Sequence, residues 1–168
     1  MGGCAQLLGP QHLSWSEAEL QQMLQRRFPL ERRVLEVLDV QIAPPALSLL
    51  PERHRVALDL QLQGRDRVFA SRFSARLGLE SALRYEPADQ SLRLSGLRLT
   101  RIGSEGATPA EPALLQRLGA VVAESLLEGT VVYRLPPEQL ERLRLLGYQP
   151  DRVDIDQRGL TLTLKPRS

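Results

Sequence analysis

The segment Arg55-Val56-Ala57-Leu58-Asp59-Leu60-Gln61-Leu62-Gln63 decides the fold, because apolar and polar side chains alternate along it. Such alternation is typical of a β-strand that buries one face and exposes the other to solvent. The expected buried face consists of Val56, Leu58, Leu60 and Leu62. We therefore predict a half-buried strand over residues 55–63, with a sheet built around it.

The segments on both sides of this strand carry the same alternation. We predict further strands over residues 34–43, 68–80, 82–85, 91–102, 131–135, 152–156 and 160–165. Short turns separate many of them, such as Gly64-Arg65-Asp66 and Pro87-Ala88-Asp89. Strands joined by short turns pair antiparallel, so we expect an antiparallel sheet.

The alternation slips by one residue within the segment 91–102. Leu92 and Leu94 share one parity, whereas Leu97 and Leu99 share the other. The slip falls at Gly96, and a one-residue slip beside a glycine is typical of a β-bulge. We therefore expect a bulge at Gly96 that curls the sheet.

Three segments have the apolar periodicity of helices: residues 14–28, 112–129 and 137–146. The first begins with Ser14-Trp15-Ser16-Glu17, a capping-box pattern whose serine and glutamate side chains satisfy free backbone N–H groups. The second has a broad apolar face between Pro112 and Gly129. Together with the strands, these helices predict an α+β fold in which helices cover one face of a curved sheet.

The length and charge of the chain narrow its class. At 168 residues it is long enough for one domain with a sizeable core, and we predict a tether over residues 1–13 and a single domain over 14–168. The 22 basic and 20 acidic residues nearly balance, and Lys165 is the only lysine. This balance is unlike the basic field of a nucleic-acid-binding protein, so we expect no nucleic-acid partner.

Motifs for catalysis, cofactors and metals are absent from the sequence. It has no nucleophile elbow, phosphate loop, dinucleotide fingerprint or Cys-x-x-Cys pair, and His12 and His54 are isolated. An EF-hand loop starting at Asp154 would place Arg158 and Lys165 at positions that need oxygen ligands. We therefore expect a protein that is not an enzyme and that holds no cofactor and no metal.

Several segments of the chain form a combination seen in one known family. They are Cys4 near the start, Ser16-x-x-Glu19-Leu20, Phe28-Pro29, Gly129-Thr130-Val131-Val132-Tyr133-Arg134-Leu135, and the tail from Leu146-Gly147-Tyr148 to Leu164. Together they resemble the YceB-like family of bacterial lipoproteins. The resemblance covers nearly the whole chain and rests on pattern more than on one motif. It implies a curved antiparallel sheet wrapped around a long helix (112–129), with an N-terminal helix (14–28) and a C-terminal helix plus hairpin. This resembles one half of the tubular lipid-binding folds related to bactericidal permeability-increasing protein, and the family supplies no catalytic residues.

Cys4 is the only cysteine and follows two glycines. It can be a lipidated anchor, a free thiol in a tail, or a palmitoylation site after an N-myristoyl glycine. The last expects Ser or Thr where Gln6 stands. The lipoprotein resemblance favours the anchor, and Ala5 in place of Asp then implies the outer membrane under the enterobacterial sorting rule. On this interpretation the protein faces the periplasm in the bacterial cell envelope, tethered to the membrane by lipid.

The apolar faces of the predicted strands and of the helix 112–129 have two interpretations. They form either a plain core or the walls of a groove for an acyl chain, which the small number of aromatic residues would leave partly open. The candidate groove residues are Leu58, Leu60, Leu62, Phe69, Phe73, Leu77, Leu118 and Val122. The groove interpretation predicts a lipid or other apolar small molecule as ligand.

The polar faces of the strands and the strand edges leave two further possibilities open. Arginines on the polar faces either contact anionic lipid headgroups or form a solvated surface: Arg65, Arg67, Arg72, Arg76, Arg93, Arg98 and Arg101. If the core is solid, the alternative function is a structural or interaction module of the envelope. A sheet edge such as 131–135 or the terminal hairpin would then pair with a partner strand.

Overall fold

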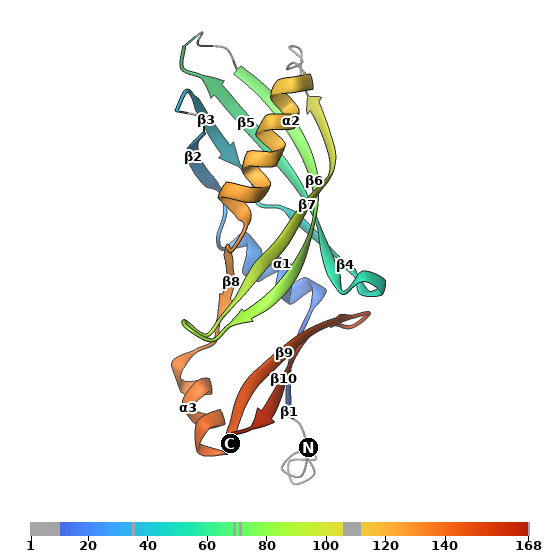
Figure 1. Cartoon of the computed structure of the whole chain (residues 1–168), viewed down its shortest axis with the longest axis vertical. Helices are drawn as coiled ribbons and strands as arrows, with labels where there is room; N and C mark the ends of the chain where they lie inside the picture. Colours follow the sequence, from blue (N-terminus) through green and yellow to red (C-terminus); the bar gives the residue numbers. More distant parts are fainter. Residues whose placement is uncertain (1–10, 35, 69, 71, 106–111, 168) are drawn as a thin grey trace.

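The computed structural model describes residues 11–34, 36–68, 70, 72–105 and 112–167 (Figure 1). Its strands are β1 (Gln11–Ser16), β2 (Leu30–Val34), β3 (Leu38–Ile42), β4 (Ala46–Leu50), β5 (Arg55–Asp66), β6 (Arg72–Glu86), β7 (Ser91–Glu105), β8 (Val131–Arg134), β9 (Tyr148–Asp156) and β10 (Gly159–Pro166). Its helices are α1 (Glu17–Gln25), α2 (Pro112–Val121) and α3 (Pro137–Leu145), with a short 3₁₀ helix (Pro51–Arg53) and a π-helical turn (Val122–Leu127). The described chain is therefore mostly β with short helices, and the predicted α+β class is wrong.

The strands form two antiparallel sheets. The larger has the order β2-β3-β5-β6-β7-β8, with β4 pairing to the first half of β5. The smaller has the order β1-β10-β9 and lies at the other end of the molecule, beside α3 (Figure 1). The predicted antiparallel pairing is confirmed.

The larger sheet is a curled half-barrel, and the expectation of a sheet wrapped around a long helix over 112–129 is wrong. α2 has ten residues and continues only as the π-helical turn. Its backbone widens there, because the Glu128 N–H donates to the Ala123 carbonyl at 3.0 Å, five residues back. Periodicity predicted the helical segment but not this change in hydrogen bonding. α2 packs against β7 and is not enclosed by the sheet (Figure 1).

The predicted bulge at Gly96 is confirmed. The register of β6 against β7 shifts between Glu80 and Ala82, opposite Gly96, which has a φ of 61°. A second shift falls between Gly78 and Leu79. Bulges bend a strand and increase its twist, so these two positions give the long hairpin its curl.

The first helix begins later than the predicted range 14–28. Residues 11–16 instead form β1, which pairs with β10 along its whole length, and this pairing occupies the segment expected to start the helix. The capping box is formed by Ser16 and Glu19 rather than by Ser14 and Glu17: the Glu19 N–H donates to Ser16 Oγ at 3.2 Å, and the Ser16 N–H donates to Glu19 Oε1 at 3.1 Å. β1 therefore starts inside the expected tether, and residues 1–10 lie outside the described residues.

Two predicted strands have different bounds. The predicted strand 34–43 contains β3 and the last residue of β2, and these two strands pair as a hairpin from Leu30 to Ile42. β5 runs through the predicted turn at 64–66, and β6 begins at Arg72. Gly64 was the reason for predicting a turn there. In the structure Gly64 continues the strand, pairs with Phe73 and lies under the Phe73 ring. An aromatic side chain over a strand glycine restores the lost packing.

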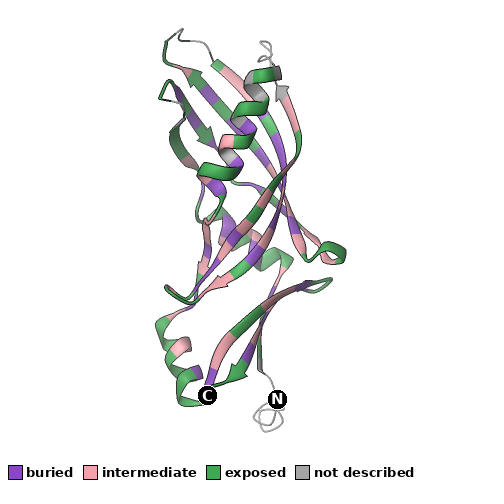
Figure 2. Cartoon of the chain, in the orientation of Figure 1, coloured by how far each residue is buried: buried purple, intermediate pink, exposed green. Residues whose placement is uncertain are grey.

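One large apolar core joins the two sheets. Leu20 and Leu24 of α1 are completely buried in it, as are Leu92 of β7 and Leu160 of β10. Figure 2 shows the buried positions alternating along the strands, and α1 lies where the two sheets meet. The core fixes the geometry of the long β5–β6–β7 face on which the candidate site is built.

Candidate functional site

The predicted groove residues on β5 and β6 lie in the core. Leu58, Leu60, Leu62 and Leu77 are at most 2% exposed and belong to one buried cluster. Phe73 is partly buried and packs against that cluster. Phe69 lies outside the described residues, as do the side chains of Leu118 and Val122. The structure therefore brings the described candidates together on one face, and a role as groove walls stays a prediction for them.

Burial along that same face decreases across the Gly96 bulge. Before the bulge, Leu92 and Leu94 are completely buried. After it, Leu97, Leu99 and Ile102 are only partly buried although they pack against the same cluster. The two bulges keep all five on one face, because Leu99 pairs with Leu79 and Ile102 with Leu77. We call residues 97–102 the post-bulge segment.

α2 approaches the post-bulge segment closely at one glycine. A Cβ atom on Gly119 would lie 3.0 Å from a methyl carbon of Leu99 and 3.0 Å from one of Ile102. Gly119 is itself buried, while its helical neighbours Arg117 and Ala120 are exposed. The helix backbone therefore comes close to the sheet at Gly119, and Leu99 and Ile102 there keep part of their surface exposed.

Glu128 directly follows the π-helical turn and binds the bulge. The carboxylate of Glu128 accepts the Gly96 N–H at 3.1 Å and the Leu97 N–H at 3.0 Å. The Gly129 N–H also donates to the Leu94 carbonyl at 2.9 Å. A bulge leaves backbone groups without ladder partners, and here one carboxylate satisfies two of them. Glu128 therefore couples the position of the helix to the curl of β7.

We expect Glu128→Ala to lower the free energy of unfolding by about 1–3 kcal/mol, because two charge-assisted hydrogen bonds to the bulge are lost. Denaturant unfolding of the purified protein measures this change. Glu124→Ala is the matched control, since Glu124 is an exposed residue of the same π-helical turn, and its effect is expected to stay within about 0.5 kcal/mol. Equal effects of the two variants would contradict a specific role for Glu128.

The opposite side of the bulge is held by an arginine. Arg55 donates through one guanidinium nitrogen to the carbonyls of Gly96 and Glu80, the latter at 3.2 Å. Its Nε lies 3.9 Å from the Glu80 carboxylate, which also pairs with Arg53. The side chains of Arg55 and Glu80 are only 15% and 12% exposed, so this pair is sheltered from solvent. The bulge is thus fixed from both sides by charged groups.

A second polar cluster ties the β6–β7 turn to the chain before β8. Asp89 accepts the Ser91 hydroxyl at 2.5 Å and pairs with Arg93, and Arg134 lies 3.5 Å from the same carboxylate. Arg93 also donates to the Gly129 carbonyl at 2.9 Å. The Ser91 hydroxyl first, and the arginines after it, hold the pKa of the Asp89 carboxyl below its ordinary value. These contacts stabilise the end of the half-barrel that faces the smaller sheet.

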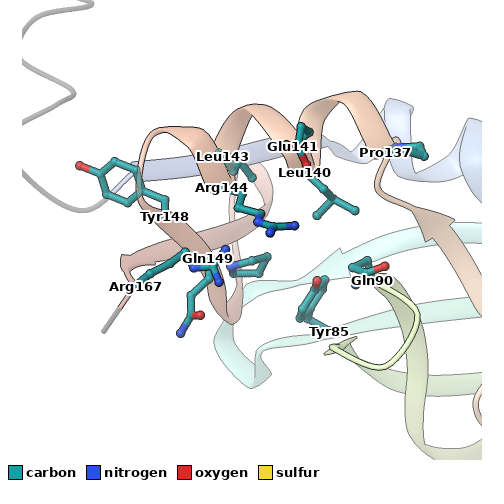
Figure 3. Close-up of a pocket in the computed structure, with 11 residues that line it drawn as sticks. Tyr85, Gln90, Pro137, Leu140, Glu141, Leu143, Arg144, Tyr148, Gln149 and Arg167 are labelled. Atoms are coloured by element: carbon teal, nitrogen blue, oxygen red, sulfur yellow. The ribbon is translucent and has the colours of Figure 1, made fainter.

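A cleft of about 300 Å³ lies between α3, the β6–β7 turn and the start of β9 (Figure 3). Its walls include Tyr85, Gln90, Arg144, Gln149 and Arg167. The guanidinium of Arg144 points from α3 into the space between the helix and Tyr85 (Figure 3). Burial, and secondarily the charge of Asp89, raise the pKa of the Tyr85 hydroxyl, so it stays protonated as a hydrogen-bond donor at neutral pH.

Sequence reasoning missed this cleft. Its residues come from three separate parts of the chain, and no motif or periodicity links Tyr85 to Arg144 or Arg167. A smaller hollow of about 250 Å³ is lined by Gln41, Gln61 and Gln63 together with Pro29, Ala43 and Pro44. Neither hollow is lined by the predicted groove residues.

Several of the outward-facing arginines have acidic partners. Arg101 lies 3.3 Å from Asp59, and Arg67 lies 3.8 Å from Asp39. Both pairs are on the outer surface of the large sheet and are substantially exposed. Such exposed pairs are typical of a solvated outer face, and contact of the other strand arginines with lipid headgroups stays a prediction.

The described residues contain no group of three or more histidine, cysteine, aspartate and glutamate side chains that could hold a metal ion. Asp154 pairs with Arg152 at 3.1 Å and Asp151 with Lys165 at 3.4 Å. None of the described helices is both long and apolar enough to cross a bilayer. Cys4 lies outside the described residues, so its predicted lipidation stays a prediction.

Comparisons with known proteins find likeness among solved structures only. No protein-family model matches the chain, and no curated protein matches it. The crystal structure of lipopolysaccharide binding protein is similar with a TM-score of 0.36 and 11% sequence identity, covering 93% of this chain and 40% of that one. The chain thus spans about two fifths of that neighbour's length. Membership of the YceB-like family is not confirmed and stays a prediction.

Proposed function

We propose that this protein is a periplasm-facing outer-membrane lipoprotein. In this proposal it binds an acyl chain, or another apolar molecule, between α2 and the post-bulge segment of β7, and it is a binding protein rather than an enzyme. The observation that carries the binding site is the decrease in burial across Gly96. Leu99 and Ile102 face α2 yet stay partly exposed, whereas Leu92 and Leu94 on the same face are sealed.

The physical reason is the free energy of covering apolar surface. Each square ångström of apolar area removed from water contributes roughly 25 cal/mol, so an alkyl chain lying along partly exposed leucine and isoleucine side chains gains affinity from them. The bulge and Glu128 hold the helix and the strand in a fixed relation. A preorganised apolar surface binds without first having to be ordered, which lowers the cost of association.

The anchor is supported by the sequence around Cys4 and by the position of β1. The chain enters the described domain at Gln11, beside Leu164 of β10, and Cys4 precedes it by seven residues. Mass spectrometry of the N-terminal peptide tests this part, after expression in bacteria behind a lipoprotein signal peptide. We expect diacylglyceryl on Cys4 and its absence from Cys4→Ser. An unmodified Cys4 would contradict the lipid anchor but would not affect the proposal of a binding site.

Native mass spectrometry and a fluorescence titration with cis-parinaric acid test the binding site. We expect a bound lipid mass that organic extraction removes, and a saturable parinaric acid signal from the extracted protein. Leu99→Gln with Ile102→Gln is expected to weaken parinaric acid binding at least tenfold, because an amide without a partner is placed against the ligand. Thr100→Gln is the matched control, since Thr100 is exposed on the same segment, and its affinity is expected to stay within about twofold.

Two results would contradict the binding site. One is an extracted wild-type protein that gives no saturable signal with parinaric acid and no added mass with envelope lipids. The other is equal weakening by the control and the double variant, with circular dichroism showing that both are folded. Either result would favour the alternative function as an interaction module.

A further inference from the structure

Leu145 and Leu146 are the most unusual leucines of the described chain. They are 79% and 53% exposed, whereas the described leucines of the core are nearly all sealed from water. They lie at the end of α3, which is largely exposed in Figure 2. Exposing two adjacent leucine side chains to water at a helix end costs free energy, unless an apolar partner covers them.

Cationic side chains surround this leucine pair. Arg142 and Arg144 occupy the last turn of α3, and the Arg167 N–H donates to the Gly147 carbonyl at 2.8 Å, which places Arg167 beside the helix end. Within the described part of the chain, none of these three arginines has an ion pair with an acidic side chain. Glu141 is the acidic residue nearest in sequence, and Lys165 is already paired with Asp151. The surface around the leucines therefore keeps an excess of positive charge.

The cleft beside α3 adds hydrogen-bond donors behind the same surface. Arg144 and Arg167 share it with the Tyr85 hydroxyl and the side-chain amides of Gln90 and Gln149 (Figure 3). The Glu141 carboxylate also lines the cleft, but the two guanidinium groups outnumber it. Together with the hydroxyl and amide groups they suit a phosphate oxyanion. The apolar pair and the donor-rich cleft are thus neighbours on one end of the molecule.

The topology places the start of the domain at this same end. Gln11 of β1 pairs with Leu164 of β10, and Pro166 pairs with Tyr148, which follows α3 by three residues. Figure 1 shows β1 and β10 at the same end of the molecule as α3, and far from the end of the half-barrel where α2 begins. A chain tethered through residues that precede Gln11 would therefore turn α3 towards the membrane.

We infer that the α3 end is a docking surface for an anionic lipid bilayer. Leu145 and Leu146 enter the boundary between headgroups and acyl chains, and Arg142 lies at the headgroup level. Arg144 and Arg167 bind a lipid phosphate at the mouth of the cleft. This inference deepens the proposed membrane location, but it requires neither the lipidation of Cys4 nor a ligand under α2.

Flotation with lipid vesicles tests this docking surface, using Cys4→Ser so that no lipid anchor contributes. We expect this protein to float with vesicles of equimolar phosphatidylglycerol and phosphatidylcholine, and to bind pure phosphatidylcholine at least tenfold more weakly. Leu145→Ser with Leu146→Ser is expected to weaken binding about tenfold or more. Arg144→Gln with Arg167→Gln is expected to weaken it about 25-fold, which is about fivefold for each charge near an anionic surface.

Val68→Ser is the matched control, because Val68 is 64% exposed and follows β5 at the end of the large sheet that lies away from α3 (Figure 1). Its binding is expected to stay unchanged. The inference would be overturned if the Cys4→Ser protein did not float, or if its leucine variant floated equally well. It would also be overturned if inorganic phosphate displaced the protein from vesicles while the leucine variant bound normally, which would indicate a free-anion site. A dimer in solution that the leucine variant dissociates, without vesicle binding, would also overturn it and assign the surface to a second copy.

Discussion

Leu60→Ala is expected to lower the free energy of unfolding by about 2–5 kcal/mol, the range for a buried leucine truncated to alanine. Leu60 is completely buried at the middle of β5, where it pairs with Leu77 of β6. The truncated side chain would leave a cavity between strands that are fixed by neighbours on both sides, so the core can relax only partly. Denaturant unfolding followed by circular dichroism measures the change.

Gln61→Ala is the control for this core variant. Gln61 is the next residue of β5, its side chain is exposed, and its expected effect is within about 0.5 kcal/mol. The comparison also separates the two interpretations of the predicted groove. A loss below about 1 kcal/mol for Leu60→Ala would show that Leu60 borders open space rather than a packed core.

Gly159→Ala is expected to cost about 4 kcal/mol or more, because the site has no room for a side chain and a backbone conformation that disfavours one. Gly159 has a φ of 148°, and a Cβ atom there would overlap the Trp15 carbonyl oxygen and lie 2.9 Å from the Ser16 Cα. The contact is with backbone of β1, so no side-chain rotation can relieve it. We expect β1 to separate from β10, and thermal unfolding measures the loss.

Gly147→Ala provides the comparison that separates strain from crowding. Gly147 also has a positive φ, of 82°, but a Cβ atom there would meet nothing within 4 Å. Its expected cost is therefore about 1–2 kcal/mol, the backbone strain alone. Similar losses for the two glycine variants would contradict the close approach of β1 to β10.

The bulge at Gly96 connects the fold to the proposed site. Without it, the apolar residues after Gly96 would point to the solvent face of the sheet, because a one-residue slip reverses every side chain. With it, Leu97, Leu99 and Ile102 stay on the face that α2 covers, and Glu128 satisfies the backbone groups that the bulge frees. The same feature therefore curls the sheet, orients the post-bulge segment and attaches the helix segment to it.

Local patterns in the sequence determined a large part of this architecture. The alternation in 55–63 identified β5 and its buried face, and the phase slip identified the bulge, because both depend on side-chain periodicity within one strand. Residues 131–135 and 137–146 were likewise predicted close to β8 and α3. These elements need only their own residues to be recognised.

Features that depend on distant partners could be decided only by the tertiary structure. Residues 14–16 have a helix-start pattern, yet they form a strand because β10, almost 150 residues later, pairs with them. The end of α2 becomes a π-helical turn, beyond which Glu128 reaches the bulge. The cleft exists because the fold places Tyr85 and Arg167 beside α3. The exposure of Leu145 and Leu146 likewise depends on what the fold packs against that helix. Periodicity reports which face of an element is buried, whereas long-range pairing decides what covers it and what remains uncovered.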